Sequence, residues 1–233
     1  MTQTIQAVLF DFGGTLDANG LHWRERFRRI YADSGCPAAP ETFDRAFYDA
    51  DDNLPARFAL AGLSLEETVR LQAGCVLDAL NMARGTYLEK ITRRFVEESR
   101  TALQLNRPLL ERLRRRFRLG IVSNFYGNLD SILEHEGLAD LFDAVADSEK
   151  VGALKPDKKL FLHATDLLGV APEAALMVGD SVPRDMRGAE ALGMPHAWVR
   201  GERDRKDACC AQATILDALS DLEDLLLPKE AAA

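Results

Sequence analysis

The sequence has few of the residues on which disulfide-rich or zinc-binding proteins depend. Its 233 residues include four cysteines and four histidines, and neither type occurs at metal-ligand spacing. No CxxC pair is present, so neither a disulfide framework nor a zinc site is indicated. We therefore expect the cysteines (Cys36, Cys75, Cys209 and Cys210) to be reduced thiols in a cytoplasmic protein.

Long apolar runs and an excess of positive charge are missing too. No stretch approaches the roughly 20 apolar residues of a membrane-spanning helix. The amino terminus lacks the basic segment and apolar run of a signal peptide. The formal net charge is −8, which disfavours nucleic acid or an anionic membrane surface as a partner. These features favour a cytoplasmic protein with neither partner, and they contain no signal for an oligomeric state.

Residues 21 to about 104 show helical periodicity and almost no strand pattern. Apolar side chains recur at helical spacing, for example Trp23, Phe27 and Ile30. Further along, Ser64 followed by Glu67 has the pattern of a capping box at a helix start. We predict an all-α subdomain over residues 19–104.

On both sides of this region, short apolar runs alternate with helical segments. The expected strands cover the apolar run that begins at Ile5 and leads into Asp11, and residues 118–124, 142–146, 174–178 and 197–199. We expect one helix to start at Pro108, another to have Pro156 in its first turn, and a last one to carry Ile215 and Leu222. Such alternation is typical of a doubly wound parallel α/β sheet with helices on both faces. The predicted core comprises residues 1–18 and 105–228, with residues 229–233 as a disordered tail.

Asp11 follows the first apolar run and is itself followed by Gly13, Gly14 and Thr15. Glycines permit a tight turn, and their unhindered N–H groups can approach an oxyanion. Asp11 should therefore stand at the carboxyl end of a central strand. Open α/β sheets bind ligands at that edge.

Other polar residues occupy equivalent positions in the predicted sheet. Ser123 and Asn124 end the second strand, and Asp180 follows the fourth, with Asp185 five residues later. Lys155 lies in the loop after the third strand. Because parallel strands end at one edge, we expect these side chains to converge in one crevice.

A divalent cation would suit such a cluster. Close carboxylates raise one another's pKa unless cations compensate their charge. Mg²⁺ prefers carboxylate, water and phosphate oxygens, so Asp11, Asp180 and Asp185 are candidate ligands. Lys155 and Ser123 are candidate partners of a phosphoryl group. Asp11 could then attack phosphorus and form an aspartyl-phosphate.

In their order and types, these motifs resemble those of the haloacid dehalogenase-like (HAD) hydrolase superfamily. The matching segments are Asp11-Phe12-Gly13-Gly14-Thr15, Ser123-Asn124, Lys155-Pro156 and Gly179-Asp180-Ser181-x-x-x-Asp185. The resemblance spans nearly the whole chain. It implies a Rossmann-like core with a helical cap inserted after the first motif.

The resemblance also implies roles for single residues. Asp11 would be the nucleophile and a metal ligand, together with Asp180 and the backbone carbonyl of Gly13. Asp185 would support the metal or the lysine, and Lys155 would neutralise charge. The phosphate would be bound by Gly14, Thr15, Ser123, Asn124 and Lys155. The implied cofactor is Mg²⁺, and the implied partner is a small phosphorylated molecule.

Gly13 departs from the phosphatase pattern of this superfamily. Phosphatases usually have there a second aspartate, which protonates the leaving alcohol and then activates water. General acid–base help of this kind contributes about 10²–10⁴-fold in rate. The site could therefore bind Mg²⁺ and phosphate and still turn over ordinary phosphate esters poorly.

Three interpretations remain open at this point. The first, which we favour, is a Mg²⁺-dependent phosphohydrolase whose substrate has a good leaving group, or whose missing acid comes from the cap or the substrate. The second is a phospho-ligand-binding or regulatory module with an impaired site. The third is a 2-haloacid dehalogenase, since those enzymes also lack the second aspartate, although they need no metal. Trp23, Asn53 and Arg57 could line the cap side of the crevice, but packing or surface roles fit each of them better.

Overall fold

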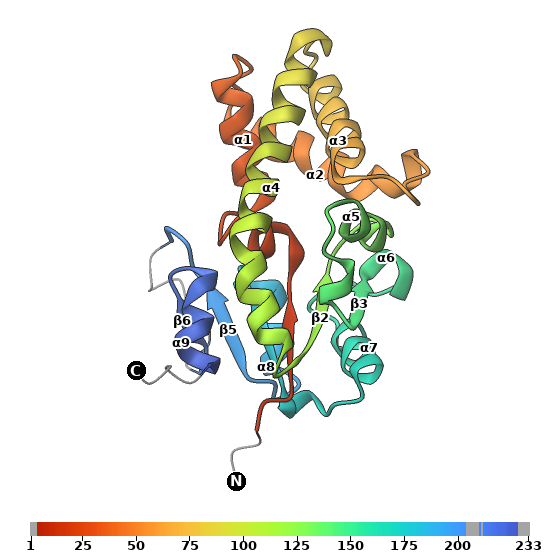
Figure 1. Cartoon of the computed structure of the whole chain (residues 1–233). Coiled ribbons are helices and arrows are strands. Elements are labelled where there is room, and N and C mark those ends of the chain that lie inside the picture. Colours follow the sequence, from red (N-terminus) through yellow and green to blue (C-terminus); the bar gives the residue numbers. More distant parts are fainter. Residues whose placement is uncertain (1–3, 204–209, 211, 228–233) are drawn as a thin grey trace.

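The computed structural model describes residues 4–203, 210 and 212–227. In this part of the chain, one sheet of six parallel strands has the order β3-β2-β1-β4-β5-β6 (Figure 1). The strands are β1 (Ala7–Phe10), β2 (Arg118–Ser123), β3 (Ala144–Asp147), β4 (Ala175–Gly179), β5 (His196–Val199) and β6 (Thr214–Leu216). The predicted Rossmann-like α/β architecture is confirmed.

Side chains of the central strand β1 alternate between two apolar layers. Val8 and Phe10 pack with α4 (Gly85–Arg114), α5 (Leu129–His135) and α9 (Leu222–Leu226). Ala7 and Leu9 pack on the other face, with α7 (Lys158–Leu168) and α8 (Arg187–Glu190). A strand buried on both faces needs apolar residues at every position, which explains the uninterrupted run in the sequence.

The helical region lies beyond the end of the sheet toward which β1 runs (Figure 1). It comprises α1 (Trp23–Asp33), α2 (Pro40–Arg57), α3 (Leu65–Ala79) and the first part of α4. The predicted capping box of Ser64 and Glu67 is present at the start of α3. Aromatic rings fill the centre of this helical region, with the rings of Phe27 and Phe95 stacked at 4.2 Å between centroids. The division into core and cap at residues 18 and 104 stays a prediction.

Helix α4 passes without a break through Pro108, so the prediction that a helix begins at this proline is wrong. The helix carries apolar residues of the cap in its first half and of the core in its second half, including Ile91, Leu110 and Leu113. Asn106 donates a hydrogen bond from Nδ2 to the Leu16 carbonyl oxygen at 2.8 Å. The packing along its length therefore outweighs the usual effect of an internal proline.

The chain departs from prediction at three further points. Ile215 lies in the edge strand β6, not in a final helix, and α9 begins at Leu222. Pro156 precedes α7, whose N-cap is Asp157. Cys36 and Cys75 are buried free thiols as expected, whereas Cys210 is disulfide-bonded, so that expectation is wrong there. Cys209 and the predicted tail at residues 229–233 lie outside the described residues.

The remaining short elements connect the strands. They are α6 (Ser148–Val151), the turns of helix at Ala139–Leu141, Pro172–Ala174 and Leu219–Asp221, and two wider turns at Phe12–Leu16 and Val182–Met186. Both wider turns directly follow strand ends that carry predicted site residues. Among the described helices, none is both long and apolar enough to cross a membrane.

Candidate active site

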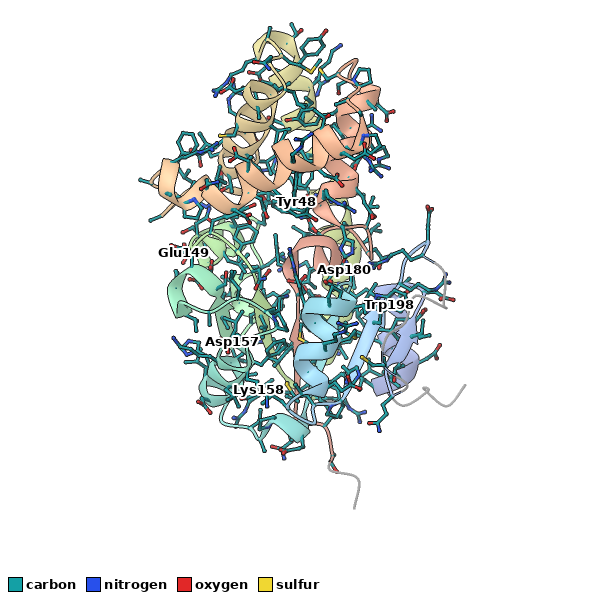
Figure 2. The ribbon with its side chains drawn as sticks, turned by 180° about the vertical axis from the view of Figure 1, so that it is seen from behind. Tyr48, Glu149, Asp157, Lys158, Asp180 and Trp198 are labelled. Carbon is teal, nitrogen blue, oxygen red and sulfur yellow. The ribbon has the colours of Figure 1, made fainter. Side chains whose placement is uncertain are left out.

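The predicted site residues meet at the carboxyl edge of the sheet. Asp11 continues β1, whose last residue Phe10 pairs with Ile121 of β2 and Val178 of β4. That register brings Ser123 and Asp180 to either side of Asp11. Figure 2 shows Asp180 on the core below Tyr48, which projects from cap helix α2. The convergence expected from the strand ends is thus observed.

Lys155 lies at the centre of the charged groups. Its Nζ atom is 2.7 Å from Asp11 Oδ1 and 2.7 Å from Asp185 Oδ1, and it donates to the Val122 carbonyl at 2.9 Å. Burial alone would lower the pKa of Lys155, but the two carboxylates outweigh it and raise the pKa. The ammonium group therefore remains charged beside Asp11.

One carboxylate oxygen of Asp11 accepts all of its described contacts. The Ser123 hydroxyl donates to Oδ1 at 2.8 Å, and Lys155 contacts the same atom. Asp11 is 7% exposed and lines a cavity of about 250 Å³. Within the described residues, Oδ2 has no hydrogen-bond partner, which leaves this oxygen for a ligand or an electrophile.

Three buried carboxylates surround this point. Ligand atoms of Asp11, Asp180 and Asp185 lie within 4.8 Å of one another. Burial raises the pKa of Asp185 to about 7. The charges of Asp11 and Asp180 add to this shift, and Lys155 opposes it. The cluster thus has more negative charge than Lys155 compensates. An all-oxygen set with excess negative charge fits a hard divalent cation such as Mg²⁺.

Asp180 is held from several directions. Thr15 Oγ1 donates to Asp180 Oδ1 at 3.1 Å, and Trp198 Nε1 donates to its backbone carbonyl at 3.0 Å. Thr15 is fully buried, and neither it nor Gly14 lines the cavity. Their predicted contact with phosphate therefore stays a prediction, while the visible function of Thr15 is to orient Asp180.

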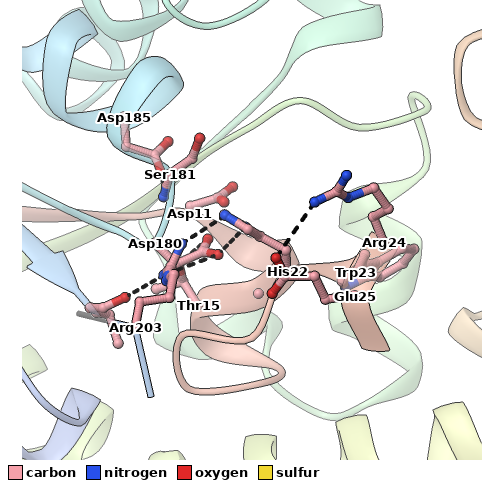
Figure 3. A network of polar contacts seen from close by, with 12 residues as sticks. Asp11, Thr15, His22, Trp23, Arg24, Glu25, Asp180, Ser181, Asp185 and Arg203 are labelled. Atoms are coloured by element: carbon pink, nitrogen blue, oxygen red, sulfur yellow. Dashed lines mark hydrogen bonds and ion pairs between the residues drawn. The ribbon is translucent and has the colours of Figure 1, made fainter. Parts of the chain in front are cut away.

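Two basic side chains that the sequence did not reveal also lie at Asp180 (Figure 3). His22 Nδ1 forms an ion pair with Asp180 Oδ2, and an Arg203 nitrogen is 3.8 Å from the same oxygen. Burial opposes the charge on His22, but the contact with Asp180 raises its pKa. His22 is 181 positions from Arg203, and no local sequence pattern links them.

Two glycines are required by the carboxylates beside them. Gly14 has φ +95°, and a Cβ there would be 2.7 Å from Asp180 Oδ2. A Cβ on Gly179 would lie 2.3 Å from Asp185 Oδ2. Side chains at either position would push the carboxylates apart, so these glycines permit the compact cluster.

The side chain of Asn124 forms hydrogen bonds with the backbone of Lys155. Its Oδ1 accepts from the Lys155 N–H at 2.7 Å, and its Nδ2 donates to the Lys155 carbonyl at 3.3 Å. Asn124 also lines the cavity. Its observed contacts fix the lysine loop, and its predicted contact with phosphate stays untested.

Trp23 covers the position where the second aspartate of the phosphatase pattern would stand. A Cβ on Gly13 would be 3.1 Å from Trp23 Nε1. The indole donates to Asp17 Oδ2 at 2.8 Å, and Asp17 also binds Arg26 and the Ser99 hydroxyl. Trp23 lines the cavity, whereas Asn53 and Arg57 do not.

Comparison with known proteins agrees with an α/β hydrolase built around acidic strand ends. A sequence model of the haloacid dehalogenase-like hydrolases matches residues 5–193. The chain belongs to this family. It is 32% identical to the phosphoserine phosphatase of Thermus thermophilus, with 85% of this chain and 83% of that protein covered.

Two further relatives match this chain over only part of their length. The pyrimidine 5'-nucleotidase YjjG of Escherichia coli is 33% identical over 51% of this chain and 53% of that protein. The chain spans 35% of haloacid dehalogenase-like hydrolase domain-containing protein 3 of Bos taurus. Among solved structures, a HAD phosphatase from Thermococcus onnurineus has a TM-score of 0.58 and 25% identity, with 96% and 98% of the two chains covered.

Proposed function

We propose that this hydrolase is a Mg²⁺-dependent phosphohydrolase that acts on a small phosphorylated molecule through an aspartyl-phosphate on Asp11. The observation that carries the proposal is the position of Asp11: one oxygen is held by Lys155 and Ser123, and the side chain lines a cavity. The relatives named above as phosphatases support the same class of reaction.

The residues present fit a bound Mg²⁺. Asp11 and Asp180 would hold it directly, with the Gly13 carbonyl as a further oxygen and Asp185 within reach. When bound, Mg²⁺ would neutralise negative charge on the phosphoryl oxygens. His22 contacts Asp180 Oδ2, so an ion bound through that oxygen would have to share it with His22.

The protein's own groups suit attack on phosphorus. A bond would form between a carboxylate oxygen of Asp11 and phosphorus as the bond to the leaving oxygen breaks. Lys155, charged and buried, would offset the negative charge of Asp11 and of a phosphoryl oxygen. Ser123 can donate its hydroxyl proton to the phosphoryl group. Water would then attack phosphorus as the bond from phosphorus to the Asp11 oxygen breaks, which releases inorganic phosphate and restores the Asp11 carboxylate.

Proton transfer to the leaving group is the weak step in this scheme. Gly13 provides no side chain, and Trp23 covers its α-carbon. A substrate whose leaving group needs no proton, such as an acyl phosphate, would avoid the difficulty. We therefore expect faster release of phosphate from acyl phosphates than from alkyl esters.

The second candidate is a phospho-ligand-binding module with an impaired site. The contact of Trp23 with Gly13 favours it, because an acid–base side chain at position 13 would have to displace the indole slightly. A dehalogenase is the weaker alternative. Its reaction needs no metal, whereas three carboxylates are clustered here around one ammonium group.

A substrate panel separates these possibilities. It contains acyl, sugar and aryl phosphates and a short 2-haloacid, each with Mg²⁺ or chelator. Phosphate release that chelator abolishes supports the proposal, and chelator-insensitive halide release contradicts it. Binding of beryllium fluoride without turnover on any substrate would favour the impaired module.

A further inference from the structure

A second polar network lies on the cap side of the cavity, centred on Asp51 of α2. Tyr126, which follows the second motif in the core, donates its hydroxyl to Asp51 Oδ1. Gln72 of α3, itself fully buried, donates to the same oxygen at 2.9 Å. Asp51 and Tyr126 both line the cavity with Asp11. Three elements thus fix one carboxylate facing the candidate active site.

Only one oxygen of Asp51 is satisfied by these donors. The hydrogen bonds from Tyr126 and Gln72 both end on Oδ1. Within the described part of the chain, Oδ2 has neither a hydrogen bond nor an ion pair, and it is not sealed from solvent. Burial raises the pKa of Asp51, and Tyr126 and Arg184 only partly offset it. The open oxygen Oδ2 is an acceptor held in place by the two hydrogen bonds on Oδ1. A cationic donor bound there would favour the ionised carboxylate that burial disfavours.

A guanidinium group lines the same cavity. Arg184 is exposed, and no ion pair or hydrogen bond of its side chain occurs among the described residues. It is close enough to lower the pKa of Asp51 electrostatically, but the two do not form an ion pair within 4.0 Å. The cavity therefore presents one carboxyl group and one guanidinium group that do not pair with each other, besides the phosphoryl site.

We propose that Asp51 and Arg184 select a phosphorylated zwitterion, with a substrate ammonium group at Asp51 and a substrate carboxylate at Arg184. The chemical class is that of phosphorylated amino acids. This inference rests on the proposed function, since it assumes that the phosphoryl group binds beside Asp11. A hydroxyl-bearing phosphate ester would need no charged acceptor, so charge distinguishes the two classes.

Three phosphonates test the pairing without turnover. They are 2-amino-4-phosphonobutanoate, 4-phosphonobutanoate, which lacks the amine, and 3-aminopropylphosphonate, which lacks the carboxylate. Calorimetry with Mg²⁺ should show the first binding at least about 10-fold more tightly than either of the others, as expected for charge-assisted hydrogen bonds.

Matched variants assign the preference to the two residues. Asp51→Asn keeps acceptors for Tyr126 and Gln72, and it should reduce the preference for the amine below about 3-fold. Arg184→Gln should do the same for the carboxylate. Asp52→Asn removes an equal charge from the exposed neighbouring position and should change neither preference.

The results separate this inference from the proposed function. Equal affinities for the three phosphonates, or equal effects of Asp51→Asn and Asp52→Asn, would overturn the zwitterion pairing. Binding of inorganic phosphate without binding of any of the three phosphonates would also overturn the zwitterion pairing. If neither phosphate nor any phosphonate binds with Mg²⁺, the phosphohydrolase proposal itself fails.

Discussion

The Trp23 indole lies against the α-carbon of Gly13, at a distance that leaves room for a Cβ only if the ring moves slightly. The ring is fixed by its hydrogen bond to Asp17 Oδ2 at 2.8 Å. Gly13 has an ordinary φ of −74°, so its backbone does not demand glycine. The contact with Trp23 is therefore what opposes an aspartate at this position.

Restoring the missing carboxylate should raise turnover. We predict that Gly13→Asp increases kcat on ordinary alkyl phosphates by about 10²-fold, the lower end of what general acid–base catalysis provides. Adding Trp23→Phe, which removes the crowding Nε1 atom, should increase the gain further. Steady-state phosphate release measures both. Gly13→Asn is the matched control, since it fills the space without an acid. A folded, metal-binding Gly13→Asp variant with no gain would refute this explanation of the missing acid.

Lys155 should be essential for the stability of the carboxylate cluster. It is 4% exposed and contacts Asp11 and Asp185, so Lys155→Met leaves buried charge uncompensated. We expect the free energy of unfolding in urea to fall by about 3–5 kcal/mol. Added Mg²⁺ should restore part of it. Lys150→Met, which removes a half-exposed pair with Asp130, should cost less than about 1 kcal/mol, and equal losses would contradict the account.

Metal binding should depend on Asp180. Because ligands that bind only the folded state raise its stability, saturating Mg²⁺ should increase the melting temperature of the wild type. Asp180→Asn should remove most of that increase and abolish phosphate release. Asp17→Asn does not serve as a control, because Asp17 also anchors the cap. Asp157→Asn, at the exposed N-cap of α7, should retain the full increase. A normal Mg²⁺ response in Asp180→Asn would show that the ion binds elsewhere.

Asp17 should hold the cap helices to the first motif. It accepts from the Gly14 N–H at 2.7 Å, and it receives hydrogen bonds from Arg26 of α1 and Ser99 of α4. Breaking this fully buried pair by Arg26→Met should cost about 3–5 kcal/mol of unfolding free energy. Ser99→Ala should cost about 1 kcal/mol. Denaturant titrations that show no loss for Arg26→Met would exclude an anchoring role.

The strand ends could be predicted because their signal is local. Apolar runs identify buried strands, and Asp11, Ser123 and Asp180 each follow or end one of them. Parallel topology then requires these residues to share one edge. Lys155 was found in the same way, from the loop after a strand. The Rossmann-like core followed from this alternation of strands and helices.

The rest depends on contacts between distant segments. The contact between Arg203 and His22 and the contacts of both with Asp180 have no local pattern. Asp51 reaches the cavity only because α2 packs above the second motif. Pro108 indicates a helix start by its local preference, but packing on both the cap and the core carries α4 through it. The short edge strand β6 was hidden in a sequence that also has helical spacing.

The most direct test of the central claim is the covalent state of Asp11. Protein incubated with acetyl phosphate and Mg²⁺ is quenched in acid, digested and examined by mass spectrometry. We predict one phosphoryl group on the peptide that contains Asp11. It should be absent when chelator replaces Mg²⁺ during the incubation, and absent in Asp11→Asn. Metal-dependent phosphate release at the wild-type rate by Asp11→Asn would contradict the account.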